Sequence, residues 1–395
     1  MLKTTPFHAR TASRCLSHAW RRWAGYVVAS CYELSHEREY QAIRSAAALL
    51  DVSPLYKYLV RGKDAARLLD RVMTRDIARS AVGQVLYTPW CDAAGKVLDD
   101  GTVSRLGEQA FRMTSADPNL RWLADNAMGL DVAIDDVSES IAALALQGPA
   151  SREILQTLTD TDLSDLKYFR IAAAKLRGSS VTISRTGYTG DLGFEIWLDA
   201  AHALSVWDAV TEAGTPYGIT PAGMLALDVA RIEAGLMLID VDYIPARKAL
   251  IEGQMSSPFE LDLGWAVSLD KDHFVGKNAL AQEAQRGAQW HFVGLEVEWD
   301  ALERLYAEVG LAPRLPTAAW RASVPVYAGG EQAGYATSGG WSPLLKRYLA
   351  LAHVRSRWAA AGTALEMEVT IEHRRKRAAA RVVKKPFFNP ERKRA

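Results

Sequence analysis

The sequence changes its pattern near residue 285, and this change constrains the fold more than any other feature. Before it, apolar residues at helical spacing interleave with strand-like runs. After it, short strand-like runs dominate, and glycine, proline and serine separate them, most densely in GGEQAGYATSGGWSP. The runs are HFVGLEVEW, VPVYAG, ALAHV, ALEMEVTI and ARVVKKPFF. We expect residues 286–395 to form a small antiparallel barrel or sandwich.

Residues 1–285 mix helical and strand signals. Helices are expected from Ser35, through Leu68–Val72 and from Pro149. The best-marked helix opens with Thr220–Pro221 as N-cap and first-turn proline, and it stops at Gly235.

Two pairs of strand-like runs predict hairpins in the same part. VLYTPW (85–90) leads through DAAGK into VLDDGTVSRL (97–106), and VTISR (181–185) and FEIWL (194–198) flank GYTGDLG. Strands and helices do not alternate strictly, so an α+β fold is favoured over a doubly wound sheet.

Composition excludes several classes of protein. Lys and Arg number 47 against 46 Asp and Glu, which removes the electrostatic case for a nucleic-acid binder. No apolar run approaches the roughly 18 residues of a membrane span. The three cysteines are too widely spaced for a disulfide framework or a CxxC metal site. We expect a cytoplasmic protein that contacts neither nucleic acid nor membrane.

Both ends of the chain are basic. The first 31 residues contain five Lys or Arg and no Asp or Glu, a bias that resembles a transit peptide. Trp20, Trp23 and Tyr26 suit a packed core instead, and we favour that interpretation. For HRRKR (373–377) and ERKR (391–394) we expect a solvated strand edge and a disordered tail.

Common catalytic motifs are missing. The sequence has no GxGxxG after a strand, no P-loop, no GxSxG and no HExxH, and its eight histidines show no metal-ligand spacing. We expect no metal. Polar residues beside aromatic ones suggest a bound organic cofactor instead.

Asp99 and Asp100 lie mid-strand, where carboxylates are disfavoured. Strand alternation places them on opposite faces, so one points toward the interior or a pocket. The alternative is a simple turn signal, DDG.

Glu195 shares a strand face with Trp197, whereas Phe194, Ile196 and Leu198 share the other. A carboxylate beside an indole suits a flat heterocycle that donates hydrogen bonds. An exposed strand face is the alternative.

Arg231 falls on the apolar stripe of the 221–234 helix, with Leu227 and Asp228. A buried arginine needs a partner. Either it pairs with Asp228 three residues earlier, or it holds a carboxylate or a developing anion.

Seven blocks, in order, resemble the glycine-cleavage T-protein (aminomethyltransferase) family, covering about residues 35 to 388. They are DVSPLYKYLVRG, GKVLDDGTV, LQGPASREIL, SRTGYTGDLGFEIWL, PAGMLALDVARIEAGL, PFELDLGWAVSLDKDHFVGKNAL and VVKKPFF.

The resemblance implies a three-lobed α+β fold. Residues 1–285 would form a folate-binding domain of two discontinuous α+β lobes, and residues 286–395 a C-terminal antiparallel β-barrel. Tetrahydrofolate would lie at the centre and exchange a one-carbon unit at its N5 atom.

The resemblance also assigns roles to individual residues. Asp100 would lie near N5, Glu195 at the pteridine edge, and Tyr87 and Tyr188 against the cofactor. Arg231 would lie close to the reacting centre. A positioned carboxylate that accepts the N5 proton contributes about 10²–10⁴-fold to rate.

One departure from the family bears on the substrate. YIPARKALIEGQMSS (243–257) is inserted after GLMLIDVD, beside the expected active centre. Such insertions are typical of relatives that demethylate small molecules, including methoxylated aromatic acids. Tyr243 would then donate a proton or hydrogen bond to the departing oxygen. Alternatively, it packs the insertion against Trp265.

Three functions follow from the resemblance. The favoured one is a tetrahydrofolate-dependent methyltransferase or demethylase with a small-molecule methyl donor. The first alternative is the glycine-cleavage aminomethyltransferase, which needs a lipoyl carrier protein. The second is a non-catalytic folate-binding accessory protein, weakened because no cysteine lies in a KGC-like motif.

Overall fold

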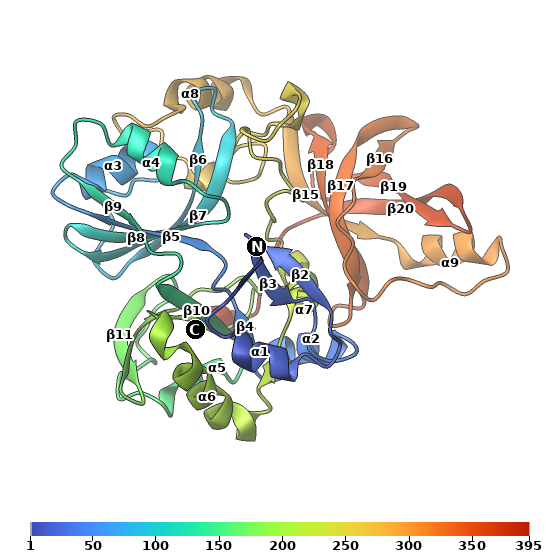
Figure 1. The fold of residues 1–395 in the computed structure, drawn as a ribbon. Helices are drawn as coiled ribbons and strands as arrows, with labels where there is room; N and C mark the ends of the chain where they lie inside the picture. Colours follow the sequence, from blue (N-terminus) through green and yellow to red (C-terminus); the bar gives the residue numbers. More distant parts are fainter. Residues whose placement is uncertain (1, 395) are drawn as a thin grey trace.

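Three β-structures, each the centre of one lobe, organise the computed structural model, which describes residues 2–394 (Figure 1). A six-stranded sheet and a five-stranded sheet form two α+β lobes, and a closed six-stranded barrel forms the third. This arrangement confirms the expected three-lobed α+β fold with its antiparallel C-terminal barrel.

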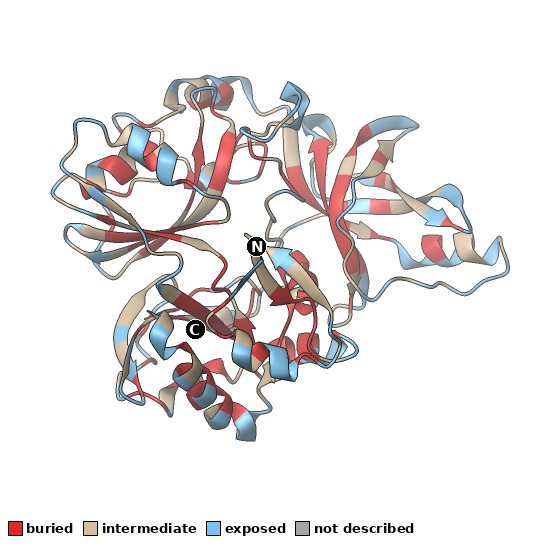
Figure 2. Cartoon of the chain, in the orientation of Figure 1, coloured by how far each residue is buried: buried red, intermediate tan, exposed pale blue. Residues whose placement is uncertain are grey.

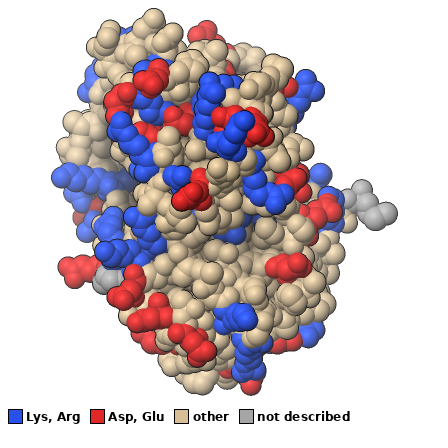
Figure 3. Space-filling model, turned by 90° about the vertical axis from the view of Figure 1, so that its left-hand side faces the viewer, with Lys and Arg blue, Asp and Glu red and all other residues tan. Residues whose placement is uncertain are grey.

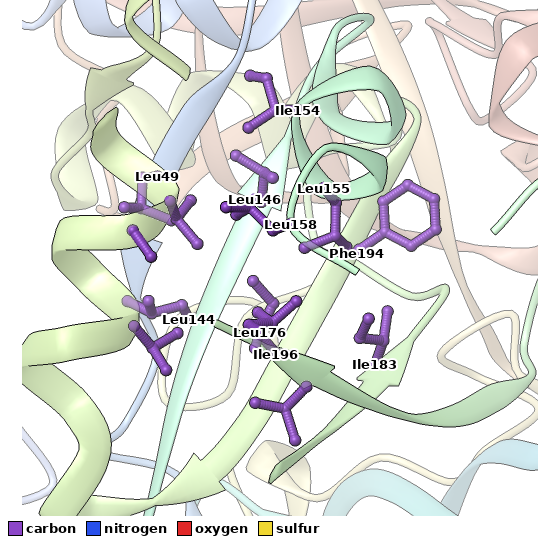
Figure 4. Close-up of a cluster of buried hydrophobic side chains, with 14 of the residues drawn as sticks. Leu49, Leu144, Leu146, Ile154, Leu155, Leu158, Leu176, Ile183, Phe194 and Ile196 are labelled. Carbon is purple, nitrogen blue, oxygen red and sulfur yellow. The ribbon is translucent and has the colours of Figure 1, made fainter. Parts of the chain in front are cut away.

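The six-stranded sheet has the order β11-β12-β13-β10-β4-β14. Its strands are β4 (Ala48–Asp51), β10 (Ile141–Gln147), β11 (Ile171–Leu176), β12 (Ser179–Ser184), β13 (Gly193–Asp199) and β14 (Thr220–Pro221). Four helices cover it: α2 (Glu37–Ser45), α5 (Ser151–Gln156), α6 (Ala203–Gly214) and α7 (Met224–Glu233). Phe194, Ile196 and Leu198 pack with α5 and α6 (Figure 4), whereas Trp197 packs with α2 and α7, as strand alternation predicts.

The five-stranded sheet has the order β6-β7-β8-β5-β9. Its strands are β5 (Tyr56–Arg61), β6 (Val85–Cys91), β7 (Val97–Gly107), β8 (Ala110–Ser115) and β9 (Ala133–Asp136). The helices α3 (Ala65–Val72), α4 (Leu120–Asn126) and α8 (Lys277–Arg286) belong to this lobe. Its core lies between the sheet and α3 and α4, so the opposite sheet face is left for the centre of the molecule.

The barrel closes in the order β15-β18-β17-β16-β19-β20. Its strands are β15 (Trp290–Val297), β16 (Val324–Ala328), β17 (Glu331–Ser342), β18 (Arg347–Arg355), β19 (Ala364–Ile371) and β20 (Arg374–Val383), and α9 (Trp299–Ala307) packs on β20. The glycine-rich run that we expected to separate strands is therefore itself the long strand β17. Its glycines allow close packing, since a Cβ at Gly334 would lie 2.0 Å from the His353 carbonyl oxygen.

The two basic ends are both packed. The N-terminal β1 (Lys3–Thr4), α1 (His8–Arg14), β2 (Trp20–Trp23) and β3 (Tyr26–Ala29) form a small sheet and helix against the six-stranded lobe. Phe7 is part of the main core, whereas Trp20, Trp23 and Tyr26 are only half-buried, so the core interpretation holds for the segment but only in part for these three aromatic residues. At the other end Arg392 donates to Asp191 at 2.6 and 2.9 Å, so the expectation of a disordered tail is wrong. The 374–377 segment is the start of β20, where it pairs with β19 only and is mostly exposed, because β15 joins β20 from Ala380 onward; this agrees with the expected solvated strand edge.

The helix expected from Thr220 begins later. Thr220 and Pro221 form β14, which pairs in parallel with Ala48 and Leu49 of β4, and α7 starts at Met224. The local N-cap and proline signal was overridden by this sheet pairing.

Burial is concentrated at the strands and inner helix faces (Figure 2), and acidic and basic side chains are mixed over the face shown in Figure 3. Between residues 2 and 394, no helix has the length and hydropathy needed to span a bilayer. The domain division expected after residue 285 falls in the last turn of α8 and stays a prediction.

Candidate active site

Asp100 is held by two tyrosines on the inner face of the five-stranded sheet. The Tyr87 hydroxyl, on the neighbouring β6, donates to Oδ2 at 2.8 Å, and the Tyr243 hydroxyl donates to Oδ1 at 2.5 Å. Burial raises the pKa of Asp100, and the two hydroxyl hydrogen bonds act against that rise. A carboxylate with a raised pKa is suited to accept and return a proton near neutral pH.

Asp99 points to the other side of the strand, as alternation predicts, and its hydrogen bonds are all internal. Oδ1 accepts from the Asp100 N–H, and Oδ2 accepts from the Asp117 N–H, the Asn119 amide and Arg247. Burial, and then the charge of Asp100, raise the pKa of Asp99 to about 7. Asp99 therefore ties the β7–β8 hairpin to the 243–257 segment.

Glu195 lies in a second group of polar residues. Its Oε2 accepts from the Thr186 hydroxyl at 2.6 Å, and burial raises its pKa. The guanidinium of Arg112, on β8, lies 4.3 Å from the Trp197 ring centroid and acts electrostatically on Glu195. Glu195 and Trp197 share one strand face as expected, and this face is not solvent-exposed: Trp197 is buried and Glu195 is half-buried.

Arg231 is fully buried and bound to two carboxylates. Its Nε lies 3.3 Å from Asp228 Oδ1, and its Nη1 donates to Asp242 Oδ2. Burial, the largest single effect, lowers the pKa of Arg231, but Asp242, Tyr188 and Asp228 together outweigh it and the pKa is raised. The predicted ion pair with Asp228 is thus present, yet Nη2 has no hydrogen-bond partner among residues 2–394.

The barrel fixes Asp242 from the opposite side. The hydroxyls of Thr337 and Ser338 donate to Asp242 Oδ1 at 2.5 and 2.7 Å, and His353 Nε2 lies 2.6 Å from the Asp242 carbonyl oxygen. Arg231 is therefore held directly by Asp228 of its own helix and by Asp242 of the GLMLIDVD turn. The barrel acts on it indirectly, by fixing Asp242.

Tyr188 and Trp265 complete the site. The Tyr188 hydroxyl donates to the Met237 carbonyl oxygen, and its pKa is raised by burial and influenced by Arg231, Asp242 and Asp100. Trp265 is 63% exposed and stacks on Tyr87 with ring centroids 6.1 Å apart.

The inserted segment enters the site through Tyr243, whose side chain is buried among Cys91, Leu261 and Phe274. Its hydroxyl binds Asp100 and not Trp265, which stacks on Tyr87 instead. The side chain thus both packs the insertion and contacts the carboxylate.

The predicted residues form two groups. Asp100, Tyr87, Tyr243, Tyr188 and Arg231 make the first, and Glu195 belongs to the second with Arg112 and Trp197. The RTGYTG loop joins them because it carries both Thr186 and Tyr188, and a Thr102–Thr114 hydroxyl hydrogen bond of 2.7 Å joins their strands.

Several buried polar atoms of these groups lack a partner within the described chain. They are Arg112 Nε and Nη2, Arg231 Nη2 and Trp197 Nε1. Unsatisfied buried donors are rare and call for an explanation. Donors, carboxylates and aromatic rings together fit a flat heterocycle such as a reduced pterin.

Two family models match this chain in succession. The GCVT N-terminal domain matches residues 7–271, and the glycine cleavage T-protein C-terminal barrel domain matches residues 308–389. The chain belongs to the glycine cleavage T-protein family.

Similar proteins agree with this assignment. An aminomethyltransferase from Caldanaerobacter subterraneus is 36% identical over 371 residues, which are 93% of this chain and 91% of the relative. One from Halothermothrix orenii is 33% identical over 98% of this chain and all of the relative. The crystal structure of glycine cleavage system aminomethyltransferase T from Bartonella henselae superimposes with a TM-score of 0.83 at 25% identity, covering 98% and 99% of the two chains.

Membership confirms that the chain is a transferase whose cofactor is tetrahydrofolate. Sequence reasoning missed Arg112 and Asp242, and it named Trp265 only as a packing partner of Tyr243. A lone arginine between apolar residues in AFRMTS was the available signal for Arg112, since alternation gives it the face of Thr114. Nothing in the sequence linked Asp242 to the barrel hydroxyls.

Proposed function

We propose that the protein transfers an aminomethyl-derived one-carbon unit from a lipoyl carrier protein to tetrahydrofolate in the cytoplasm. The observation that carries this proposal is the similarity, over nearly the full length of both chains, to aminomethyltransferases at 33–36% identity. That similarity supports the alternative reading of the sequence better than demethylation of a methoxylated aromatic acid.

The site residues have distinct proposed tasks. Bound tetrahydrofolate would supply N5, the secondary amine that takes up the one-carbon unit, and the transfer balances by release of ammonia and of the free thiol of the carrier. Asp100 accepts the proton lost from that amine, and Tyr87 and Tyr243 hold its carboxylate in one orientation. Glu195 accepts hydrogen bonds from the pteridine edge, and Tyr188 lines the same space. Arg231 presents its free Nη2 to negative charge near the reacting centre.

A small-molecule methyl donor remains a second candidate because of Tyr243. Its hydroxyl lies on Asp100 at the start of the 243–257 insertion. In an ether demethylation this hydroxyl would turn from Asp100 to the departing alkoxide or phenolate and donate to it, while Asp100 receives the proton lost from N5. An accessory role without transfer has no comparable support.

One assay separates these functions. Purified protein is incubated with tetrahydrofolate and either an aminomethyl-loaded lipoyl carrier protein, a methoxylated aromatic acid or dimethylsulfoniopropionate. Mass spectrometry of the folate product distinguishes 5,10-methylene- from 5-methyl-tetrahydrofolate. We expect the methylene product with the carrier protein only, and Asp100→Asn serves as the control of strongly reduced turnover. The 5-methyl product from a small molecule would overturn the carrier assignment in favour of the second candidate.

A further inference from the structure

Arg112 has an unusual position for a buried arginine. It lies in the middle of β8, opposite Ser104 of β7 and Leu59 of β5, with only 4% of its surface exposed. Its Nε and Nη2 find no hydrogen-bond partner within residues 2–394. The Trp197 ring at 4.3 Å stabilises the cation but uses none of its N–H groups.

This arrangement is costly for the folded chain. Burial lowers the pKa of Arg112 to about 10, so the guanidinium stays charged at neutral pH. A buried charge without hydrogen bonds destabilises a fold, and replacement by an apolar side chain is commonly neutral or stabilising. A ligand that accepts hydrogen bonds from Arg112 would account for the cost.

Glu195 indicates which kind of ligand this is. Glu195 and Arg112 act on each other electrostatically, yet no ion pair within 4.0 Å joins them in the described part of the chain. Because Glu195 already balances the charge of Arg112, a carboxylate ligand would add an uncompensated negative charge to a buried site. A neutral group with donors on one side and an acceptor on the other satisfies both side chains.

The edge of a 4-oxopteridine has this pattern. Its 2-amino group and N3–H are donors, and the adjacent O4 is an acceptor. This inference rests on the proposed binding of the pteridine edge by Glu195. If Glu195 binds N3–H, the adjacent acceptor O4 lies on the side of the Arg112 guanidinium.

We propose that Arg112 donates to O4 of the pteridine while Glu195 accepts from N3–H and the 2-amino group. Arg112 is then a specificity residue that selects 4-oxo over 4-amino folates. A 4-amino group presents N–H where Arg112 also presents N–H, and buried donors facing each other leave both unpaired.

Calorimetric binding tests this proposal without turnover. Tetrahydrofolate and its 4-amino analogue, tetrahydroaminopterin, are titrated into wild type, Arg112→Met and Arg105→Met. Arg105 is the matched control because it stacks on Phe111 at 5.2 Å, but its guanidinium donates to the Ser80 and Glu108 carbonyl oxygens.

We expect wild type to prefer tetrahydrofolate over the 4-amino analogue by about tenfold or more, as for a charge-assisted hydrogen bond. Arg112→Met should lose about tenfold in affinity for tetrahydrofolate, change little for the analogue, and melt at or above the wild-type temperature. Arg105→Met should keep the wild-type preference.

Two results would overturn the assignment of Arg112: a wild type that binds both ligands equally, or an Arg112→Met variant that weakens both by the same factor. The change in preference between wild type and Arg112→Met decides, because the 4-amino analogue also lacks N3–H, the proposed donor to Glu195, and wild type would lose affinity for it on that ground alone. A wild type that binds neither ligand would instead refute the folate site itself.

Discussion

Arg44 and Arg112 are both almost inaccessible to solvent, 5% and 4% exposed, but the protein surrounds them in opposite ways. Arg44 donates to Glu233, to the Thr189 carbonyl oxygen and to the Ala230 carbonyl oxygen, and it also pairs with Asp191 at 3.5 Å. Arg112 has an aromatic ring and, among residues 2–394, two nitrogens without a hydrogen-bond partner. The chain can fully satisfy a buried arginine where the fold requires it, so an unsatisfied one indicates a ligand.

The same contrast separates the neighbouring carboxylates of β7. Asp99 accepts from donors of its own lobe and from Arg247, whereas Asp100 accepts side-chain hydrogen bonds from the two tyrosine hydroxyls of the site. Arg44 and Asp99 have their hydrogen bonds satisfied within the protein, so substituting them should change stability. Arg112 and Asp100 face the candidate site, so substituting them should change ligand binding or rate.

The largest expected effect is on stability, from Arg44→Met. Removing this guanidinium leaves Glu233 and Asp191 with too few buried partners, which costs about 3–5 kcal/mol. Denaturant unfolding measures the loss, and calorimetry of the folded variant should show near-normal tetrahydrofolate affinity. Arg61→Met, which breaks an exposed pair with Asp135, should cost less than about 1 kcal/mol. An Arg44 variant of normal stability but poor folate affinity would contradict the view that Arg44 serves the fold and Arg112 the ligand.

Asp100→Asn should lower turnover about 10²-fold, because the site keeps its shape but loses its proton acceptor. Steady-state kinetics and calorimetry together check that folate affinity changes little. Asp99→Asn should instead lower stability by about 1–3 kcal/mol, since an amide cannot accept all the hydrogen bonds that Asp99 accepts. The reverse outcome for the two variants would place the wrong aspartate in the site.

Glu195→Ala should weaken tetrahydrofolate binding by about 1.5–3 kcal/mol through loss of a charged acceptor, without unfolding the chain. Calorimetry measures the affinity and circular dichroism the fold. Glu212→Ala is the control, because that carboxylate pairs with Arg177 at the exposed surface. Unchanged affinity in a folded Glu195 variant would remove this residue from the site.

The smallest effect is expected from Tyr243→Phe, which removes one of the two hydroxyls on Asp100. Those hydrogen bonds oppose the burial that raises the Asp100 pKa, so losing one raises the pKa further. As the proposed base, Asp100 would act in its ionised form, and the rising limb of the pH–rate profile should therefore move to higher pH. A shift to lower pH would show that Asp100 is not the titrating group. With an ether donor, turnover should also fall, whereas folate affinity and stability should stay nearly normal.

The local sequence pattern predicted correctly which way a site side chain points wherever strand alternation alone decides it. That rule placed Asp99 and Asp100 on opposite faces and Glu195 beside Trp197. It failed where distant partners decide: Thr220 and Pro221 join β4 instead of starting a helix, and the glycines of β17 form a strand because Trp320 and its neighbours pack closely on them. The sequence AFRMTS could not identify Arg112 as a ligand-binding residue. Only the folded structure shows which of its nitrogens lack a hydrogen-bond partner among the described residues.

The order of strands in the six-stranded sheet has a consequence for biosynthesis. The partners of β4 are β10 and β14, and all five strands of the neighbouring sheet lie between β4 and β10 in the chain. A ribosome therefore delivers the complete inserted sheet, to residue 136, while Leu49 and Leu50 still lack both neighbours. Unpaired apolar strands are prone to join the wrong edge. Between the emergence of residue 51 and that of residue 147, β4 therefore has no partner strand of its own sheet.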